Sequence, residues 1–110
     1  MIELKNEIRE SKYIEVLHEE DYKTMPCNFV INKRNSKDIT PTVAIINFQD
    51  GPLDDKELNG IFNEDLIAII IKRIECLQKT KYRNIENDLA LLKLEEALVA
   101  LKYVSDNIYK

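Results

Sequence analysis

The chain has 110 residues, of which 45% are apolar and 33% charged, and its formal net charge is −4. This length suits one domain, and the composition is that of an ordinary soluble protein. A general double-stranded DNA binder would carry a basic excess, so we expect no DNA partner, and any nucleotide ligand should be small. The longest apolar run, residues 66–71, is far shorter than the roughly 20 residues that cross a bilayer. The N-terminus lacks the apolar core of a signal peptide, so we expect a cytoplasmic protein with no membrane partner.

The first half of the chain is typical of β-strands. Residues 13–17, 27–32 and 42–49 are rich in β-branched and aromatic side chains, which favour strands. The polar stretch 33–38 carries turn residues and is expected to close a hairpin. Residues 1–11 suit either a short helix or an extended arm. Gly60, after Asn59, predicts a turn with a residue fit for positive φ.

The second half predicts an antiparallel helical hairpin over residues 63–80 and 84–108, with Asn63 and Asn84 as N-caps. A surface helix of a monomer needs one apolar stripe, and these helices have nearly two each. The excess predicts partner chains, with oligomerisation through the helices. The fold class is therefore predicted to be α+β. A small N-terminal antiparallel β-sheet (1–52) is followed by the two-helix hairpin (63–108) in a single domain, 1–110.

No catalytic set, metal site or cofactor site stands out in the sequence. His18, the one histidine, is followed by acidic residues and is interpreted as a solvated surface group. Cys27 and Cys76 fall in apolar contexts without metal spacing, so both are expected to be buried thiols. The acidic pair Glu95 and Glu96 is interpreted as a solvated helix edge.

A basic cluster surrounds the turn between the predicted helices: Lys79, Lys81 and Arg83, with Tyr82 in the middle. Cations, an aromatic ring and the free N–H groups that begin the second helix could hold a phosphate and stack a base. The simpler interpretation is that the lysines complement the dipole of the first helix and that Tyr82 packs on the hairpin. Asn87, one turn into the second helix, should make hydrogen bonds, either to the turn or to a ligand.

Several short motifs follow one another in a fixed order over residues 40–101. They are Phe48-Gln49-Asp50-Gly51-Pro52, Asn59-Gly60-Ile61, Glu64-Asp65-Leu66-Ile67-Ala68-Ile69, Arg73-Ile74, Leu77-Gln78, Glu86-Asn87 and Leu94-Glu95-Glu96-Ala97-Leu98. In this order and spacing they resemble the phage Thoeris anti-defence family, whose members end in the Acb/Tad helical hairpin. The family commonly has an aromatic residue at the position of Leu77 and an Arg at that of Val104.

The resemblance implies a sponge, which binds a cyclic nucleotide immune signal and releases it intact, and hence a protein that is not an enzyme. The signal is a cyclic ADP-ribose isomer in the Thoeris case and a cyclic di- or trinucleotide in the CBASS case. The resemblance also implies homo-oligomers, from dimers to hexamers, with pockets between chains in the cytoplasm of an infected host. Together with the basic turn, it predicts the ligand-binding residues Arg73, Leu77, Lys81, Tyr82, Arg83 and Asn87.

Two other functions are compatible with the sequence. The hairpin could bury its apolar excess against a phage or host protein, as an interaction and oligomerisation module without a nucleotide ligand. The chain could also be an enzyme that degrades the signal, although no catalytic constellation supports that.

Overall fold

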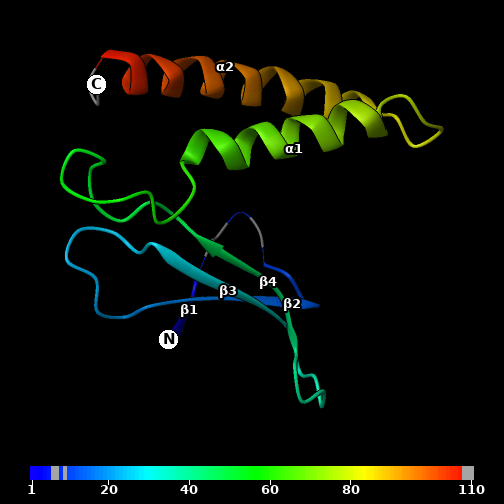
Figure 1. The fold of residues 1–110 in the computed structure, drawn as a ribbon. Helices are drawn as coiled ribbons and strands as arrows, with labels where there is room; N and C mark the ends of the chain where they lie inside the picture. The colour runs from blue at the N-terminus through cyan, green and yellow to red at the C-terminus, as the bar shows by residue number, and fades with distance from the viewer. Residues whose placement is uncertain (6–7, 9, 108–110) are drawn as a thin grey trace. The chain divides into compact units, whose positions relative to one another are not determined.

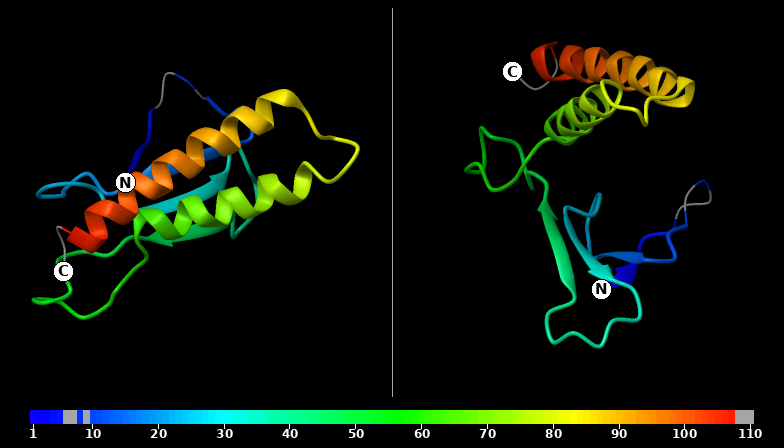
Figure 2. Two further views of the ribbon diagram at one scale, coloured as in Figure 1. Left: turned by 90° about the horizontal axis from the view of Figure 1, so that it is seen from above. Right: turned by 90° about the vertical axis from the view of Figure 1, so that its right-hand side faces the viewer.

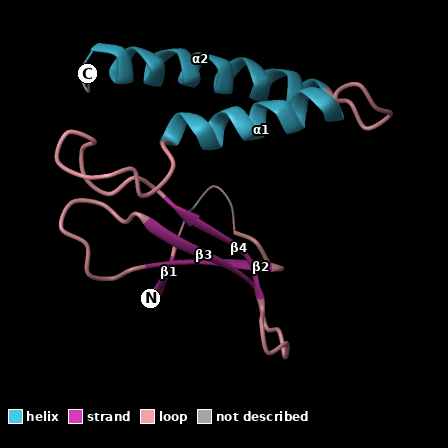
Figure 3. Cartoon of the chain, in the orientation of Figure 1, coloured by secondary structure: helices cyan, strands magenta, loops and turns pink. Residues whose placement is uncertain are grey.

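The computed structural model describes residues 1–5, 8 and 10–107. Contacts divide the chain into two compact units, Met1–Gly60 and Ile61–Lys110. The first unit holds the strands and the second holds the helices (Figures 1 and 3). The predicted α+β class, with an antiparallel sheet followed by two helices, is confirmed. That the two units make a single domain stays a prediction.

The sheet is an antiparallel meander, in which each strand pairs with its neighbour in sequence, in the order β1-β2-β3-β4. Its strands are β1 (Ile2–Glu3), β2 (Ile14–His18), β3 (Asn28–Lys33) and β4 (Thr42–Asn47). The three predicted strands are confirmed, with ends shifted by one or two residues. The first residues are extended where they form β1, while residues 6, 7 and 9 of the predicted helix or arm lie outside the described residues.

The β3–β4 connection is the hairpin that the polar stretch 33–38 predicts. Asn35 has a φ of 57°, in the left-handed region that Asn tolerates better than most side chains. Lys33 pairs with Asp38 at 2.9 Å across the turn, and its backbone N–H donates to the carbonyl of Pro41 at 2.9 Å. Local polar contacts thus close this end of the sheet.

His18 is buried, so the expectation of a solvated surface histidine is wrong. Because β2 continues through residue 18, strand alternation places the ring on the same face as its partner Phe29. The two ring centroids lie 5.8 Å apart, and Phe48 stands edge-on to Phe29 at 5.7 Å. The Nδ1 of His18 lies 2.9 Å from the carbonyl oxygen of Glu19. Cys27, as predicted, is buried in this unit.

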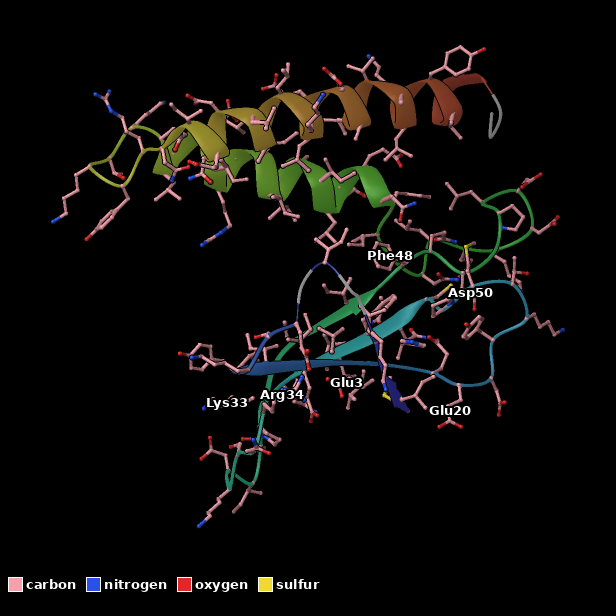
Figure 4. The ribbon with its side chains drawn as sticks, turned by 180° about the vertical axis from the view of Figure 1, so that it is seen from behind. Glu3, Glu20, Lys33, Arg34, Phe48 and Asp50 are labelled. Atoms are coloured by element: carbon pink, nitrogen blue, oxygen red, sulfur yellow. The ribbon has the colours of Figure 1, made fainter. Side chains whose placement is uncertain are left out.

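Two side chains fasten the loops of the sheet unit. The Glu19 carboxylate accepts hydrogen bonds from the backbone N–H of Cys27 at 3.1 Å and from the side-chain amide of Asn28 at 2.6 Å. The Arg34 guanidinium donates to the Glu3 carboxylate, beside which it lies in Figure 4, and to the carbonyl of Ile14 at 3.1 Å. These contacts hold β1 and the β2–β3 loop against the sheet.

The connector after β4 is closed at its neck by side-chain amides. The Asp50 N–H donates to Asn59 Oδ1 at 2.8 Å, and Asn59 Nδ2 donates to the Asp50 carbonyl at 2.9 Å. The positive φ lies at Gly51 (90°) and not at Gly60, where it was predicted. Gly60 is needed for space, because a Cβ there would come within 2.5 Å of the carbonyl oxygen of Phe48. Both glycines therefore shape the neck of this loop.

The second unit is an antiparallel helical hairpin of α1 (Asn63–Leu77) and α2 (Ile85–Asn107), which lie side by side in both views of Figure 2. α1 begins after Phe62, not after the predicted cap Asn63, and the Phe62 N–H donates to the Asp65 carboxylate at 2.9 Å. The predicted cap Asn84 is confirmed, since its Oδ1 accepts the N–H of Asn87 at 2.8 Å. α1 ends three residues before the predicted residue 80, and residue 108 lies outside the described residues.

The helices meet along a seam of half-buried side chains spaced three or four residues apart. These are Ile67, Ile71, Ile74 and Gln78 on α1, and Asn87, Leu91, Leu94, Leu98 and Leu101 on α2. The seam is apolar except at the turn, where Gln78 faces Asn87. Cys76 lies off the seam and is exposed, so the prediction that both thiols are buried is wrong for this one.

α2 carries a second row of side chains, the outer stripe, on the side away from α1. It consists of Ile85, Leu89, Leu92, Glu96, Val99 and Tyr103, and its apolar members are 51–81% exposed. Each lies two positions from a seam residue, which is about 200° around a helix of 3.6 residues per turn. The apolar excess predicted for the second helix is therefore confirmed as surface that α1 does not cover.

Candidate functional site

The turn of the helical hairpin is joined to both helices by Gln78, which follows the last residue of α1. Its Nε2 donates to the carbonyl of Asn84 at 2.7 Å and to the carboxylate of Asp88 at 2.8 Å. Its Oε1 accepts from the Asn84 N–H and from the Nδ2 of Asn87, both at 3.2 Å. Gln78 thus joins the end of α1 to the first turn of α2.

These four bonds allow only one orientation of the Gln78 amide. A flip would set its NH₂ group against the donors of Asn84 and Asn87 and its oxygen against the two acceptors. The orientation of Gln78 in turn fixes that of Asn87, whose NH₂ must point at Gln78. Within the described residues, no hydrogen bond engages Asn87 Oδ1, so this oxygen is left as an acceptor at the edge of the seam. The prediction that Asn87 bonds the inter-helix turn is confirmed.

The remaining turn residues present positive charge and an aromatic ring. Lys79, Lys81 and Arg83 are exposed, as is Tyr82, so the interpretation that Tyr82 packs on the hairpin is wrong. The Nζ of Lys81 lies 5.2 Å from the centroid of the Tyr82 ring, within cation–π range. The Thr80 hydroxyl shapes the turn, since it donates to the Leu77 carbonyl at 2.6 Å and accepts the Tyr82 N–H at 3.1 Å. We call residues 79–83 the basic turn.

The basic turn has no acidic counterpart in the part of the chain that the structure describes. The ion pairs found there join Lys33 with Asp38, Arg34 with Glu3, and Lys93 with Glu96. The lysines and the arginine of the basic turn take part in none of them. Their charges therefore face solvent, and they are available to an anion.

Of the six predicted ligand residues, the turn brings four together: Lys81, Tyr82, Arg83 and Asn87. Leu77 ends α1 directly before Gln78, and its side chain is 39% exposed. Arg73 is exposed one helical turn before Leu77, on α1. Both thus lie on the flank of α1 that leads to the basic turn.

Sequence reasoning missed the roles of Gln78, Asn84 and Asp88 in fixing this end of the hairpin. The available signal was positional, because Gln78 follows Ile67, Ile71 and Ile74 at the spacing of the seam. A polar residue at such a position must find partners when the helices pack. The nearest residues across the turn are those at the start of α2.

An open depression of about 440 Å³ lies on the sheet unit, lined by Glu10, Ser11, Lys12, Arg34 and Asn35. It is a weaker candidate, because one of its two cations, Arg34, is already paired: the hydrogen bond to Glu3 raises the pKa of Arg34 and lowers that of Glu3. Across residues 1–5, 8 and 10–107, no group of three His, Cys, Asp or Glu side chains is placed to hold a metal ion. No helix in the same described ranges is both long and apolar enough to span a bilayer.

Comparison with known proteins identifies the helical hairpin as the part of the chain by which its family is recognised. Residues 40–102 match the family described as Acb2/Tad1, hairpin domain. The chain is also 34% identical over 124 aligned positions to a protein named Thoeris anti-defense 1 from Bacillus phage SBSphiJ7, and the match covers 92% of this chain and 87% of that protein. The family match includes the connector neck, α1, the basic turn and α2 as far as residue 102. The chain belongs to the Acb2/Tad1 hairpin family.

Proposed function

We propose that this protein is a phage anti-defence sponge that binds a cyclic nucleotide immune signal and holds it without cleaving it. The name of the Bacillus phage relative supports the anti-defence role. The ligand class is a cyclic ADP-ribose isomer, the signal that the family resemblance implies for Thoeris, and cyclic di- and trinucleotides are the second candidates. The protein would act in the cytoplasm of the infected host.

The observation that carries this proposal is the uncompensated basic turn. A cyclic nucleotide carries one or more phosphate groups, and the chain as a whole has a net charge of −4. A ligand phosphate therefore needs a local cluster of cations such as Lys79, Lys81 and Arg83. The exposed ring of Tyr82 offers a stacking surface to a base, which is a contact that tolerates every base.

The neighbouring amides support binding rather than chemistry. The oriented Oδ1 of Asn87 can accept a hydrogen bond from a base or a ribose hydroxyl without rearranging, because Gln78 already holds the amide. The chain's one imidazole, that of His18, is buried in the sheet unit and makes its own hydrogen bond to Glu19. The residues gathered at the turn are those that attract and position an anion.

Homo-oligomers with pockets between chains, from dimers to hexamers, are part of the proposal. The apolar outer stripe of α2 supports it, since contiguous exposed apolar surface on a protein in water marks a site of association. A site formed between chains would also enclose a ligand more completely than a single exposed turn.

Titration calorimetry tests the proposal with a cyclic ADP-ribose isomer and with cyclic di- and trinucleotides as probes. We expect tight binding to at least one, and recovery of the intact probe after heat denaturation. Arg83→Ala and Asn87→Ala should each weaken binding about 10- to 100-fold, the usual effect of removing a hydrogen bond to a charged group or leaving one unmade. Lys37→Ala, which removes an exposed cation from the β3–β4 turn, serves as the control and should bind like wild type.

Two outcomes would favour the other functions. No binding of any nucleotide, together with stoichiometric capture of a phage or host protein, would make the chain an interaction module. Loss of the probe during incubation would make it an enzyme. Wild-type affinity in both Arg83→Ala and Asn87→Ala would show that the ligand lies elsewhere than at the basic turn.

A further inference from the structure

We propose that Asp88 sets the specificity of the nucleotide site, because its carboxylate selects a ligand that contains a ribose with two neighbouring free hydroxyl groups. Asp88 belongs to the same site as the basic turn and Asn87, so this role rests on the proposed function. It separates the two ligand classes that the proposed function leaves as alternatives, the cyclic ADP-ribose isomers and the cyclic di- and trinucleotides.

The Asp88 carboxylate lies at the base of the basic turn. Its Oδ1 accepts a hydrogen bond at 2.8 Å from Gln78 Nε2, and the same nitrogen donates to the carbonyl of Asn84 at 2.7 Å. Gln78 directly precedes the basic turn, and Asn84 directly follows it. One amide therefore holds the Asp88 carboxylate beside both ends of the basic turn.

Most of the hydrogen-bonding capacity of Asp88 is unused. An ionised carboxylate has two oxygens with about four lone-pair positions, and the bond from Gln78 takes one of them. Among the residues that the structure describes, no hydrogen bond engages Oδ2, and no ion pair includes Asp88. Because Gln78 already orients the carboxylate, little conformational freedom is lost when a ligand binds to it. Asp88 is thus a pre-oriented group that accepts hydrogen bonds and donates none.

The negative charge of Asp88 determines which part of the ligand it contacts. A phosphate group is repelled by this carboxylate and attracted by Lys79, Lys81 and Arg83. The ligand group beside Asp88 is therefore an uncharged donor, either a ribose hydroxyl or an amino group of a base. The ribose is bonded to the phosphate, whereas the base is separated from the phosphate by the ribose. A side chain next to the cations that hold the phosphate consequently meets the ribose first.

A carboxylate binds two neighbouring hydroxyls better than one, since each of its oxygens can accept one of them. Hydrogen bonds to a charged acceptor are about twice as strong as those between neutral groups. Dinucleotide-binding folds use the same chemistry, in which an acidic side chain accepts from a ribose hydroxyl. The bond from Gln78 leaves one lone pair of Oδ1 and both lone pairs of Oδ2 for such a pair of hydroxyls.

The two candidate ligand classes differ in this pair of hydroxyls. In a cyclic ADP-ribose isomer, the ring closes through C1″ of the second ribose, so the 2″- and 3″-hydroxyls of that ribose stay free. In a cyclic di- or trinucleotide, every ribose uses one of the two corresponding oxygens for a phosphodiester bond and keeps a single hydroxyl. Asp88 therefore favours a cyclic ADP-ribose isomer over the cyclic di- and trinucleotides.

Titration calorimetry tests this role with two ligands that both contain adenine, a cyclic ADP-ribose isomer and cyclic di-AMP. The new amide of Asp88→Asn can still accept the bond from Gln78 through its oxygen, but it presents an NH₂ group in place of the second oxygen. We expect this variant to bind the isomer about 10-fold more weakly, the usual effect of losing a hydrogen bond to a charged group. Its affinity for cyclic di-AMP should not fall.

Glu86→Gln is the matched control, because Glu86 is also an exposed acid in the first turn of α2. Both variants remove one negative charge from the same turn, so a general effect of charge on phosphate binding is common to them. The measured quantity is the ratio of the affinities for the two ligands, which does not depend on the fraction of folded protein. Glu86→Gln should keep the ratio of the wild type, and Asp88→Asn should lower it about 10-fold.

Two results would overturn the role of Asp88 and leave the proposed function intact. One is an equal ratio in Asp88→Asn and Glu86→Gln, and the other is a wild type that binds cyclic di-AMP at least as tightly as the isomer. If the wild type binds only the isomer, its affinity alone is compared, and a loss confined to Asp88→Asn in a variant with wild-type thermal unfolding supports the role. A wild type that binds no cyclic nucleotide would overturn the proposed function, and the role of Asp88 with it.

Discussion

Gln78→Ala is the substitution by which the hairpin is most sharply tested. It removes all four hydrogen bonds that join α1 to the start of α2 and leaves the seam otherwise unchanged. It also frees the Asn87 amide, whose orientation depends on Gln78. The variant should therefore lower both the stability of the hairpin and the affinity for a nucleotide, although we expect Gln78 itself to make no contact with the ligand.

The size of the effect follows from the number of bonds and their exposure. A hydrogen bond in a folded protein contributes about 0.5–1.5 kcal/mol net. Asn84 and Asp88 are exposed, so water can replace part of what Gln78 supplied, and the low end of the range applies. Four bonds at about 0.5 kcal/mol each amount to about 2 kcal/mol. In a chain of this size that loss corresponds to a decrease in Tm of roughly 10 °C.

The assay is thermal unfolding followed by far-ultraviolet circular dichroism, where the helices dominate the signal, and it is repeated at several protein concentrations to separate folding from assembly. Lys79→Ala is the control, because it removes a neighbouring exposed side chain from the same turn. It should leave the Tm within about a degree or two of wild type, as a surface substitution away from such features does. If Gln78→Ala lowers the Tm no more than Lys79→Ala does, the bonds of Gln78 do not hold the turn.

Two further predictions concern the sheet unit. Gly60→Ala should destabilise the fold by about 1–3 kcal/mol or more, because the new methyl group meets the backbone of Phe48, and its urea midpoint should fall below that of wild type. Glu19 is the acid-sensitive group: partial burial would raise the pKa of its carboxyl, but hydrogen bonds from Asn28 and Cys27 outweigh this and leave the pKa lowered. Its contribution to stability is thus present above the ordinary carboxyl pKa and is lost as the pH falls through the lowered value. Urea unfolding between pH 7 and pH 3 should show a shallower pH dependence for Glu19→Gln, whereas parallel curves would contradict this account.

Periodicity predicted most of the fold. The predicted ends of the strands and helices agree with the observed ends to within a few residues, because apolar spacing marks these elements directly in the sequence. The second apolar face of α2 was visible for the same reason. Spacing could not show that β2 extends through His18, since one more residue in a strand leaves no separate signal. That single residue decides whether the ring is solvated or buried beside Phe29.

The candidate site was predicted only in part. The charges of the basic turn are readable from the sequence, because Lys and Arg are solvated there whatever the exact backbone. The network around Gln78 was not, since it depends on how an amide at the end of α1 reaches the carbonyl of a residue six positions later. Gly60 shows the same limit of the sequence. A glycine there suggested a positive φ, but the residue is required because another backbone segment passes too close for a Cβ.

The order of the strands has a consequence for how fast the protein folds. Every strand pairs with its neighbour in sequence, and the two helices are joined by a short turn, so each unit forms from contacts close together along the chain. Chains of such low contact order fold quickly, because little loop entropy is lost before contacts repay it. Each unit should complete its structure soon after synthesis, and the slow, concentration-dependent step would then be the meeting of two finished chains.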